Sequence, residues 1–336
     1  MKTIYIKLTN DCNLRCKHCY LGDVPHNVMG THTYQNIMEK LDRMRIAGEK
    51  FEVILHGGEP LMHFMDPVFV NSFRTMNALN IPVTMTTNLV CELTTFKREV
   101  IGYMRPSKDS KPFICTSWDK DIRFTREGMQ ELWENNVKDL LSSGVDIQVI
   151  VTVTKILIDT MTPDELFSYF KGLGFSKINF ERLTVTGRAA KNKELIPTNK
   201  AMRKWLYDAY VVNKEKYNFS IPLFENLEWA KKGVYNGCRA RQCSKNVITY
   251  NPDGSVATCP NISGRIIAYM GRATSATEAI KVLSCETTCK QICAEEQTRH
   301  NECYTCPHFG TCNGDCFQLS WDKTGCPGLV EIMEVL

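Results

Sequence analysis

The sequence lacks the features that would place the protein in a membrane, outside the cell or on a nucleic acid. No charge-free apolar run approaches the roughly 18 residues that mark a membrane span, and the N-terminus has no signal-peptide pattern. The 41 Lys and Arg residues are scattered among 37 Asp and Glu residues, which gives a net charge of only +4. No basic cluster predicts binding to nucleic acid or to a lipid surface. We therefore expect a cytoplasmic protein.

Cysteine, in contrast, is abundant, with 16 residues in a chain of 336. In a small secreted protein such a number would indicate disulfides, but this chain is long and carries no export signal. Metal ligation accounts for the cysteines better, and sensitivity to oxygen follows as an expectation. The length allows one large domain or two ordinary ones around a sizeable core.

Three cysteines stand close together directly after an alternating apolar run at residues 3–9. They form the stretch Cys12-Asn-Leu-Arg-Cys16-Lys-His-Cys19-Tyr20. A 4Fe-4S cluster needs four ligands, so a loop that supplies three thiolates leaves one iron open to another molecule. The alternatives are a zinc site or buried cysteines, although zinc loops favour paired C-x2-C units.

The C-x3-C-x2-C spacing, with Asn13 and Leu14 after the first cysteine and an aromatic residue after the third, resembles the signature of the radical S-adenosylmethionine (SAM) enzymes. This resemblance implies that Cys12, Cys16 and Cys19 hold a catalytic 4Fe-4S cluster whose open iron binds SAM. One electron from the cluster then cleaves SAM to a 5′-deoxyadenosyl radical, which takes a hydrogen atom from the substrate. The cofactors carry this chemistry, and the protein positions the substrate.

The first half of the chain alternates β-like runs with amphipathic stretches. Strands are expected at residues 3–9, 51–56, 83–87, 113–117, 146–153 and 177–181. Helices are expected at residues 33–47, 67–79, 91–103, 126–143 and 162–173. This order predicts an α/β fold with a parallel sheet whose faces are covered. The family resembled has a partial (β/α)6 TIM-like barrel, in which ligands sit at the carboxyl ends of the strands.

Motifs follow several of these strands. Gly57-Gly58-Glu59-Pro60 resembles the family segment that contacts the SAM amino group, because glycines permit close backbone approach and Glu59 offers an acceptor. Alone, the four residues would form an ordinary turn. Asn88 after the third strand, and Ser117 and Asp119 at the end of the fourth, resemble positions that approach the SAM carboxylate and ribose. Asn and Asp also form turns, which is the alternative for both.

Residues 181–189, after the sixth strand, match a recurring segment of the family. The resemblance implies that Arg182 or Arg188 faces the active site and contacts SAM or substrate. The alternative is a solvated loop that carries two arginines. Beyond this segment Pro197 breaks the pattern, and a helix is expected at residues 199–218. We therefore divide the chain into a barrel at residues 1–195, a helical bridge at 196–237 and a cysteine-rich domain at 238–336.

The last of these segments reproduces the seven-cysteine pattern of the SPASM domain, the auxiliary-cluster extension of many radical SAM peptide-modifying enzymes. An eighth cysteine, Cys238, precedes the pattern. Carried over by position, the resemblance implies one auxiliary 4Fe-4S cluster on Cys238, Cys243, Cys259 and Cys316. It implies a second on Cys303, Cys306, Cys312 and Cys326. With four protein ligands each, these clusters would serve electron transfer or structure. The total is three 4Fe-4S clusters.

The segment between Cys243 and Cys259 predicts a β-hairpin. Strands are expected at residues 247–250 and 255–258, with Asn251-Pro-Asp-Gly254 as the turn, because Pro presets φ and Gly accepts a positive φ. This turn would bring Cys243 and Cys259 together.

Five cysteines stay outside these assignments. Cys91 and Cys115 are expected to be buried in a helix and a strand. Cys285, Cys289 and Cys293 recur every four residues and would share one helix face. They either pack as small hydrophobes or hold a further metal or thiol site.

Enzymes with this architecture mostly modify peptides or proteins. They crosslink ribosomally made precursor peptides (RiPPs), or they oxidise a Cys or Ser of sulfatases to formylglycine. The resemblance thus implies a peptide or protein substrate and an electron donor such as flavodoxin or ferredoxin. The first strand begins at residue 3, so we expect no N-terminal leader-recognition domain. Recognition would be built into the chain or supplied by a separate leader-peptide-binding protein.

The residue directly after Cys259 distinguishes the two candidate reactions. Sulfatase maturases place an Asp directly after the cysteine that corresponds to Cys259, whereas this chain has Pro260 and Asn261, which accept no proton at neutral pH. We therefore rank peptide crosslinking first and formylglycine formation second. A non-catalytic iron-sulfur electron carrier is the alternative of another class, but an open iron site and a Gly-Gly-Glu-Pro segment would give it no advantage.

Overall fold

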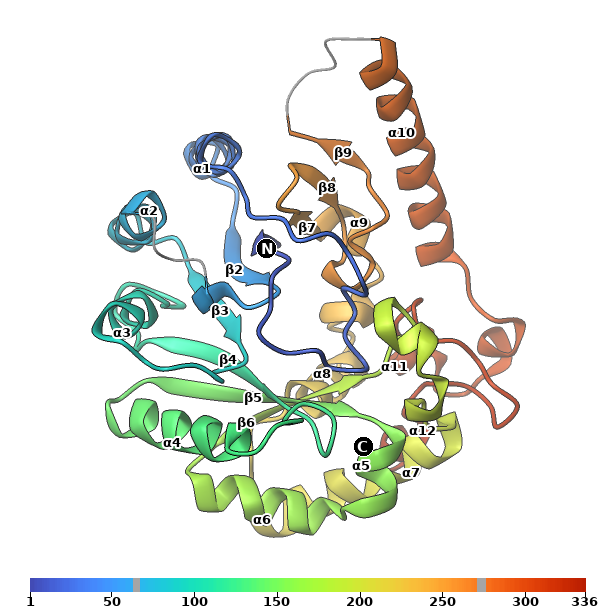
Figure 1. The fold of residues 1–336 in the computed structure, drawn as a ribbon. Coiled ribbons are helices and arrows are strands. Elements are labelled where there is room, and N and C mark those ends of the chain that lie inside the picture. The colour runs from blue at the N-terminus through green and yellow to red at the C-terminus, as the bar shows by residue number, and fades with distance from the viewer. Residues whose placement is uncertain (63–66, 271–275) are drawn as a thin grey trace.

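One mixed sheet organises the described part of the chain, which comprises residues 1–62, 67–270 and 276–336 of this computed structural model (Figure 1). Its nine strands follow the order β6-β5-β4-β3-β2-β1-β7-β8-β9, and β1 to β6 pair in parallel. The strands are β1 Lys2–Thr9, β2 Phe51–Gly57, β3 Val83–Thr87, β4 Phe113–Trp118, β5 Asp146–Val153, β6 Lys177–Arg182, β7 Val247–Tyr250, β8 Ser255–Ala257 and β9 Ala268–Tyr269. The predicted α/β fold with a parallel sheet is confirmed, and each expected strand lies within one residue of its predicted ends.

Helices separate the parallel strands, and α1 to α4 lie along the outside of the sheet (Figure 1). The helices are α1 Thr31–Ile46, α2 Pro67–Ala78, α3 Thr95–Gly102, α4 Met129–Ser142, α5 Lys155–Thr160, α6 Pro163–Leu173, α7 Asn199–Val212, α8 Pro222–Lys231, α9 Cys243–Asn246, α10 Ala276–Gln297, α11 Phe309–Cys312 and α12 Val330–Val335. Cys91, which was predicted to lie in a helix, precedes α3. The helix starts later because the Thr94 side chain caps it by accepting a hydrogen bond from the Lys97 amide.

The two faces of the parallel strands differ in chemistry. On β1, Ile4, Ile6 and Leu8 are almost wholly buried on the apolar face, whereas Tyr5 and Lys7 lie on the opposite face. The same alternation recurs on the other parallel strands, and the second face carries half-buried polar side chains such as those of His56, Ser117, Gln148 and Thr152. The apolar face packs against the helices. The polar face forms an inner wall on which a ligand or substrate could be bound.

Local signals explain the helix boundaries that the sequence predicted well. At the start of α6 the Thr162 hydroxyl accepts from the Glu165 amide while the Glu165 carboxylate accepts from the Thr162 amide, which is a capping box. Pro163 occupies the first turn, where no amide hydrogen is needed. The helix ends at Gly174 with φ 94°, a conformation that glycine adopts without a Cβ clash.

The chain after β6 returns to the sheet. Helix α7 continues as a π-helical turn, η4 Asn213–Tyr217, which confirms the expected helix beyond Pro197. The predicted hairpin is also confirmed, because β7 and β8 pair in antiparallel around a turn in which Gly254 has φ 80°. Strand β7 also pairs in parallel with β1, from Thr3 opposite Val247 to Ile6 opposite Tyr250. The sheet thus continues past residue 238, where the sequence predicts a domain boundary.

Beyond β8 the chain contains little regular structure apart from α10, which stands beside the β7–β9 end of the sheet (Figure 1). We call residues 238–336 the cysteine-rich extension. None of the helices in the described segments is both long and apolar enough to cross a membrane.

Candidate iron-sulfur and SAM site

The cysteine loop, residues 10–30 between β1 and α1, lies at the carboxyl ends of the parallel strands. Backbone hydrogen bonds attach it to two other segments. The amides of Gly58 and Glu59, which follow β2, donate to the carbonyls of Thr9 (2.8 Å) and Asp11 (2.7 Å). The amide of Arg188, after β6, donates to the Cys19 carbonyl at 2.8 Å. The three segments that the sequence predicts at one edge of the sheet therefore meet there.

Glycine is required where these segments touch the cysteine loop. A Cβ on Gly58 would lie 1.9 Å from the Asp11 carbonyl oxygen, and one on Gly57, with φ 133°, would lie 2.3 Å from the Thr9 carbonyl oxygen. Gly187, which the sequence analysis passed over, has φ 54° and would place a Cβ 2.3 Å from the Tyr20 carbonyl oxygen. The close approach predicted for Gly57 and Gly58 is thus an approach to the cysteine loop itself.

Glu59 is buried, with 1% of its surface exposed. Its carboxylate accepts hydrogen bonds from the Leu61 amide (3.0 Å), the Thr87 hydroxyl (2.6 Å) and the Asn88 amide (2.6 Å). Burial raises the pKa of this carboxyl, although the three hydrogen bonds oppose the shift. The side chain therefore ties the segment after β2 to the end of β3. Its expected role as a direct acceptor for SAM stays a prediction, and its acceptor positions already have internal donors.

Asn88 lies beside the first cysteine, and its expected approach to SAM stays a prediction. Its side-chain amide donates to the Asn13 side-chain oxygen at 2.8 Å and lies 3.7 Å from the Cys12 sulfur. The Asn13 amide in turn donates to the Val90 carbonyl at 2.6 Å. This pair of asparagines fixes the start of the loop against the end of β3.

Asp119, at the end of β4, is buried and engages both of its oxygens. It pairs with Arg123 (2.6 Å) and His18 (3.3 Å), and it accepts from the Thr152 amide at 3.1 Å. Although burial raises the pKa of the Asp119 carboxyl, His18 and Arg123 outweigh it and hold the value well below the usual range. Ser117 lies two residues earlier, half-buried on the inner wall of β4.

His18 is a residue that the sequence analysis missed. His18 is buried and lies between Cys16 and Cys19 in the sequence. Its Nδ1 atom has no hydrogen-bond partner among the described residues. Its place inside the motif was the available signal. A buried ring nitrogen without a partner leaves room for a polar group of a bound ligand at this point.

In the cysteine loop, the charges of neighbouring thiols contribute to the pKa values of Cys12 and Cys16. Burial, with smaller contributions from Glu59, Cys16 and Cys19, raises the pKa of the Cys12 thiol to about 11, and burial also raises the pKa of Cys16. Thiols in such surroundings ionise when a metal takes the place of the protons. The donor set therefore fits an iron-sulfur cluster. In the described residues no three His, Cys, Asp or Glu side chains are spaced to hold a single metal ion.

The first predicted auxiliary group comes together in the cysteine-rich extension. The Cys238 thiol shares a hydrogen bond with Cys316, which raises its pKa. Burial and then the neighbouring Cys238 and Cys259 raise the pKa of Cys243. The four cysteines are thus near neighbours, although they come from η5 Gly237–Ala240, α9, the end of the hairpin and the segment after α11.

Arg182, the last residue of β6, pairs with the cysteine-rich extension. Its guanidinium forms a buried bidentate pair with Asp315, with hydrogen bonds of 2.6 and 2.8 Å. Arg239 donates to the same carboxylate at 3.0 Å. This side chain therefore joins β6 to the residue before Cys316, and the expected approach of Arg182 or Arg188 to the active site stays a prediction. Arg188 stays near the loop, where it pairs with Asp23 at 3.0 Å.

The second predicted auxiliary group lines one cavity. Cys303, Cys306, Cys312 and Cys326 all border it, together with Trp321 and Gly328. A Cβ on Gly328 would lie 3.0 Å from the Cys312 sulfur and 3.7 Å from the Cys326 sulfur, so glycine keeps this cradle open. The arrangement fits a group held by four thiolates.

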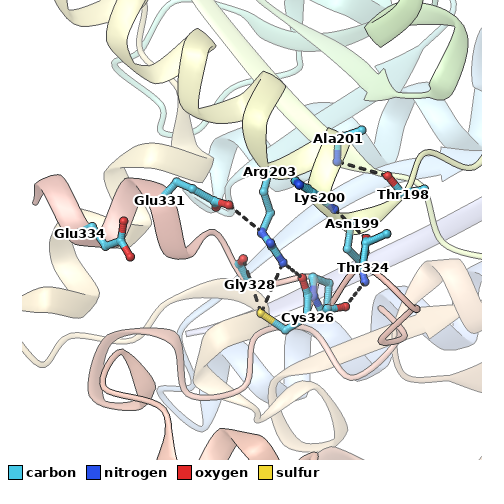
Figure 2. A network of polar contacts seen from close by, with 12 residues as sticks. Thr198, Asn199, Lys200, Ala201, Arg203, Thr324, Cys326, Gly328, Glu331 and Glu334 are labelled. Carbon is cyan, nitrogen blue, oxygen red and sulfur yellow. Dashed lines mark hydrogen bonds and ion pairs between the residues drawn. The ribbon is translucent and has the colours of Figure 1, made fainter.

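Helix α7 holds the segment that carries Cys326 (Figure 2). Arg203 donates to the Cys326 carbonyl at 2.6 Å and pairs with Glu331 at 3.0 Å. The Asn199 side chain donates to the Gly325 carbonyl at 2.8 Å. The bridge between barrel and extension therefore positions a predicted ligand.

The remaining cysteines have other surroundings. Cys285 is buried and Cys289 neighbours Cys293 on α10, as the four-residue spacing predicted. Cys115 lies on the inner wall with its sulfur 3.7 Å from the Gln148 side-chain oxygen. All sixteen cysteines, each within the described segments, are free thiols. The ligand roles assigned to eleven of them stay predictions.

Comparisons with known proteins agree with this geometry. Residues 6–167 match the model of the Radical SAM superfamily. No curated protein matches the chain by sequence. The solved structure of native anSMEcpe with bound AdoMet (SAM) and Kp18Cys peptide is 17% identical, covers 99% of this chain and 96% of that one, and has a TM-score of 0.73. Streptococcus suis SuiB bound to precursor peptide SuiA is 17% identical, covers 94% and 72%, and has a TM-score of 0.63. At these identities the likeness shows the fold alone.

Proposed function

Because residues 6–167 belong to the radical SAM superfamily, whose members bind SAM and a 4Fe-4S cluster, we propose that this enzyme uses SAM to modify a peptide. The observation that carries the proposal is the placement of Cys12, Cys16 and Cys19. They lie in one loop at the carboxyl edge of a parallel sheet, in front of a polar inner wall. The peptide-bound structures of similar fold support a peptide as the substrate.

In this proposal Cys12, Cys16 and Cys19 hold the SAM-binding cluster, and the two cysteine quartets of the extension hold auxiliary 4Fe-4S clusters. When bound, these groups supply the electron that converts SAM to methionine and a 5′-deoxyadenosyl radical, and they accept the electron that the substrate loses. The Gly57–Glu59 segment and Asn88 keep the cysteine loop in place. His18 lies in the loop, Arg188 lies next to it, and Ser117 lies on the wall of β4.

The first-ranked reaction is a crosslink within a ribosomally made peptide. A substrate C–H bond loses its hydrogen atom to the 5′-deoxyadenosyl radical. A new bond then forms at that carbon while the second side chain loses a proton, and one electron leaves the peptide. The residue at position 260 supports ranking the crosslink before formylglycine formation. Sulfatase maturases carry an Asp there, whereas this chain has Pro260. The Pro260 carbonyl accepts a hydrogen bond from Lys7, so this residue offers no free proton acceptor.

Formylglycine formation is the second candidate, and two observations favour it. The fold matches anSMEcpe, a sulfatase maturase, over nearly the whole of both chains. A carboxylate also lies near Cys259, because burial first, and then the charges of Cys238 and Glu181, raise the pKa of that thiol. Glu181 is exposed near the end of β6, so its carboxylate is accessible as a proton acceptor. A non-catalytic electron carrier has no comparable support, since the superfamily consists of enzymes.

SAM cleavage tests the proposal first. Protein reconstituted anaerobically with iron and sulfide, and reduced with dithionite, is expected to turn SAM into 5′-deoxyadenosine and methionine. Chromatography measures both products. No cleavage by a protein that holds its clusters would overturn the proposal.

Substrate class requires a second experiment. A candidate peptide, encoded as a short precursor beside the gene or copied from a neighbouring sulfatase, is deuterated at its side chains and incubated with enzyme and SAM. Deuterium in 5′-deoxyadenosine shows hydrogen abstraction from the peptide. The product mass then separates a crosslink, which lowers the mass by two hydrogens, from formylglycine made from Cys, which also exchanges sulfur for oxygen. Formylglycine made from Ser has the same mass as a crosslink and is identified by the reaction of its aldehyde with a hydrazine.

A further inference from the structure

Lys7 is a buried cation on the inner wall of the sheet, with 0% of its surface exposed. Its ammonium donates to the Ser263 hydroxyl at 2.6 Å and to the Pro260 carbonyl at 3.0 Å. It also lies 4.5 Å from the centre of the Tyr20 ring. Lys7 thus links the residue after Cys19 to the residue after Cys259.

No carboxylate balances this charge. None of the ion pairs in the described segments includes Lys7, and its two hydrogen-bond acceptors are neutral. His56, hydrogen-bonded to the Tyr20 hydroxyl at 2.7 Å, stays neutral because burial, with a smaller contribution from Lys7, lowers its pKa to about 3. A buried cation without an anion is unfavourable by several kcal/mol or more, so a partner is to be expected.

The nearest candidates for negative charge are cysteines. Burial lowers the pKa of Lys7 to about 7, and the charges that oppose this shift are those of Cys259 first and Cys19 second. A 4Fe-4S cluster with four thiolate ligands carries a net negative charge, and charge beside a cluster is one of the factors that set its reduction potential. Cys259 belongs to the first auxiliary group.

We propose that Lys7 is the counter-cation of an auxiliary cluster on Cys238, Cys243, Cys259 and Cys316 and raises the reduction potential of that cluster. The inference rests on the proposed function. Reduction adds a negative charge, which a cation beside the cluster stabilises. Lys7 therefore favours acceptance of the electron that the modified peptide gives up. Lys7 is wholly buried and acts on the cluster by its charge, so it is a tuning residue.

The test is a redox titration of the reconstituted holoenzyme followed by electron paramagnetic resonance. The signal of the first auxiliary cluster is identified by its loss in a Cys243→Ala variant. Lys7→Met, which keeps the length of the side chain and removes the charge, is expected to shift that midpoint potential downward with iron content unchanged. The cluster of the cysteine loop should shift less and the second auxiliary cluster least. Lys40→Met is the matched control, because Lys40 is an exposed lysine 5.7 Å from the Tyr250 ring.

A second pair of variants leaves Lys7 in place. Ser263→Asp puts a carboxylate beside the ammonium and is expected to lower the same potential, whereas Ser263→Asn, similar in shape but neutral, should not. This pair keeps the proposal testable if Lys7→Met fails to fold.

The outcomes separate the two proposals. An auxiliary cluster that is present, with an unchanged potential in Lys7→Met and in Ser263→Asp, overturns the role of Lys7 alone. A wild-type protein without a cluster at Cys243 and Cys259 overturns the auxiliary clusters of the proposed function, and the role of Lys7 with them. A downward shift in both variants, absent from both controls, supports the inference.

Discussion

The two cysteine-bearing regions of the molecule are held in place in different ways. Backbone hydrogen bonds from the ends of β1, β2 and β6 fix the cysteine loop, and glycines allow the contacts. Buried charged side chains also contact the loop, as in the pair of Asp119 with His18, and they connect the segments of the cysteine-rich extension. Asp315 binds two arginines, and the buried Glu296 of α10 accepts from the amides of Cys243 and Ser244. The sheet can shape the first site before any metal binds, whereas the extension depends on a few ion pairs and on what its thiols hold.

The sharpest test of this contrast removes a ligand from the loop. Cys16→Ala is expected to abolish SAM cleavage and to leave about eight of about twelve irons, because the auxiliary quartets are separate. Iron analysis and 5′-deoxyadenosine formation measure both quantities. Cys91→Ala, a half-buried cysteine outside every quartet, should change neither. SAM cleavage by Cys16→Ala would show that the open cluster lies elsewhere.

The second test adds one carbon beside the loop. Gly58→Ala puts a Cβ against the Asp11 carbonyl, so the loop must shift, and we expect SAM cleavage to fall at least about tenfold, the effect of roughly 1.4 kcal/mol. The auxiliary clusters should stay. Gly102→Ala is the control, since a Cβ there meets nothing within 4 Å. Normal activity of Gly58→Ala would mean that the loop adapts more easily than its backbone contacts indicate.

The third test concerns the ion pairs of the extension. Asp315→Asn leaves Arg182 and Arg239 buried without a counter-charge, and we expect a loss of about 3–5 kcal/mol of stability in denaturant titrations. Asp208→Asn, which breaks an exposed pair with Lys204, should lose less than about 1 kcal/mol. Equal effects of the two substitutions would contradict the contrast between the regions.

The same pair gives a pH dependence. Although burial raises the pKa of the Asp315 carboxyl, Arg182 and Arg239 hold it well below its usual range. A carboxyl whose pKa is lower in the folded state contributes stability that is complete above its unfolded pKa, about 3.9, and is lost as the pH falls toward the folded value. The wild type should therefore lose this contribution in acid, and the difference from Asp315→Asn should shrink below about pH 4.

The smallest expected effect on SAM cleavage comes from the second quartet. Cys326→Ala should remove one auxiliary cluster, leave about eight irons, and stop peptide modification while SAM cleavage continues. Cys289→Ala should keep all the irons, because α10 is not expected to hold a cluster. A loss of iron in Cys289→Ala would instead favour a further metal site on that helix.

The sequence predicted those features that depend on neighbouring residues. Alternating β-like runs located the parallel strands, and the carboxyl ends of such strands meet at one edge, so the cysteine loop, Gly58 and Asn88 were expected at the same edge. The Asn251–Gly254 turn was predicted in the same way, because its Pro and Gly residues favour the backbone angles of a turn. These signals lie within a few residues of the structure that they specify.

Contacts between distant residues could not be predicted in this way. Arg182 follows β6 as an active-site arginine would, yet its partner Asp315 is 133 residues away. Because side chains alternate along β1, Lys7 lies on the other face of the sheet from Ile6 and Leu8. The sequence does not predict that Pro260 and Ser263, far along the chain, cover this face and contact Lys7. The approach of Gly187 to Tyr20 depends in the same way on the course of the whole barrel.

The pairing of β1 with β7 has a consequence for any attempt to divide the molecule. Strand β1 lies between β2 and β7, so a chain that stops at residue 237 would leave the backbone N–H and C=O groups of Thr3 to Ile6 without partners along one side. An open edge of this kind invites pairing with other chains. The barrel by itself should therefore aggregate, because the cysteine-rich extension covers this edge of the sheet through β7.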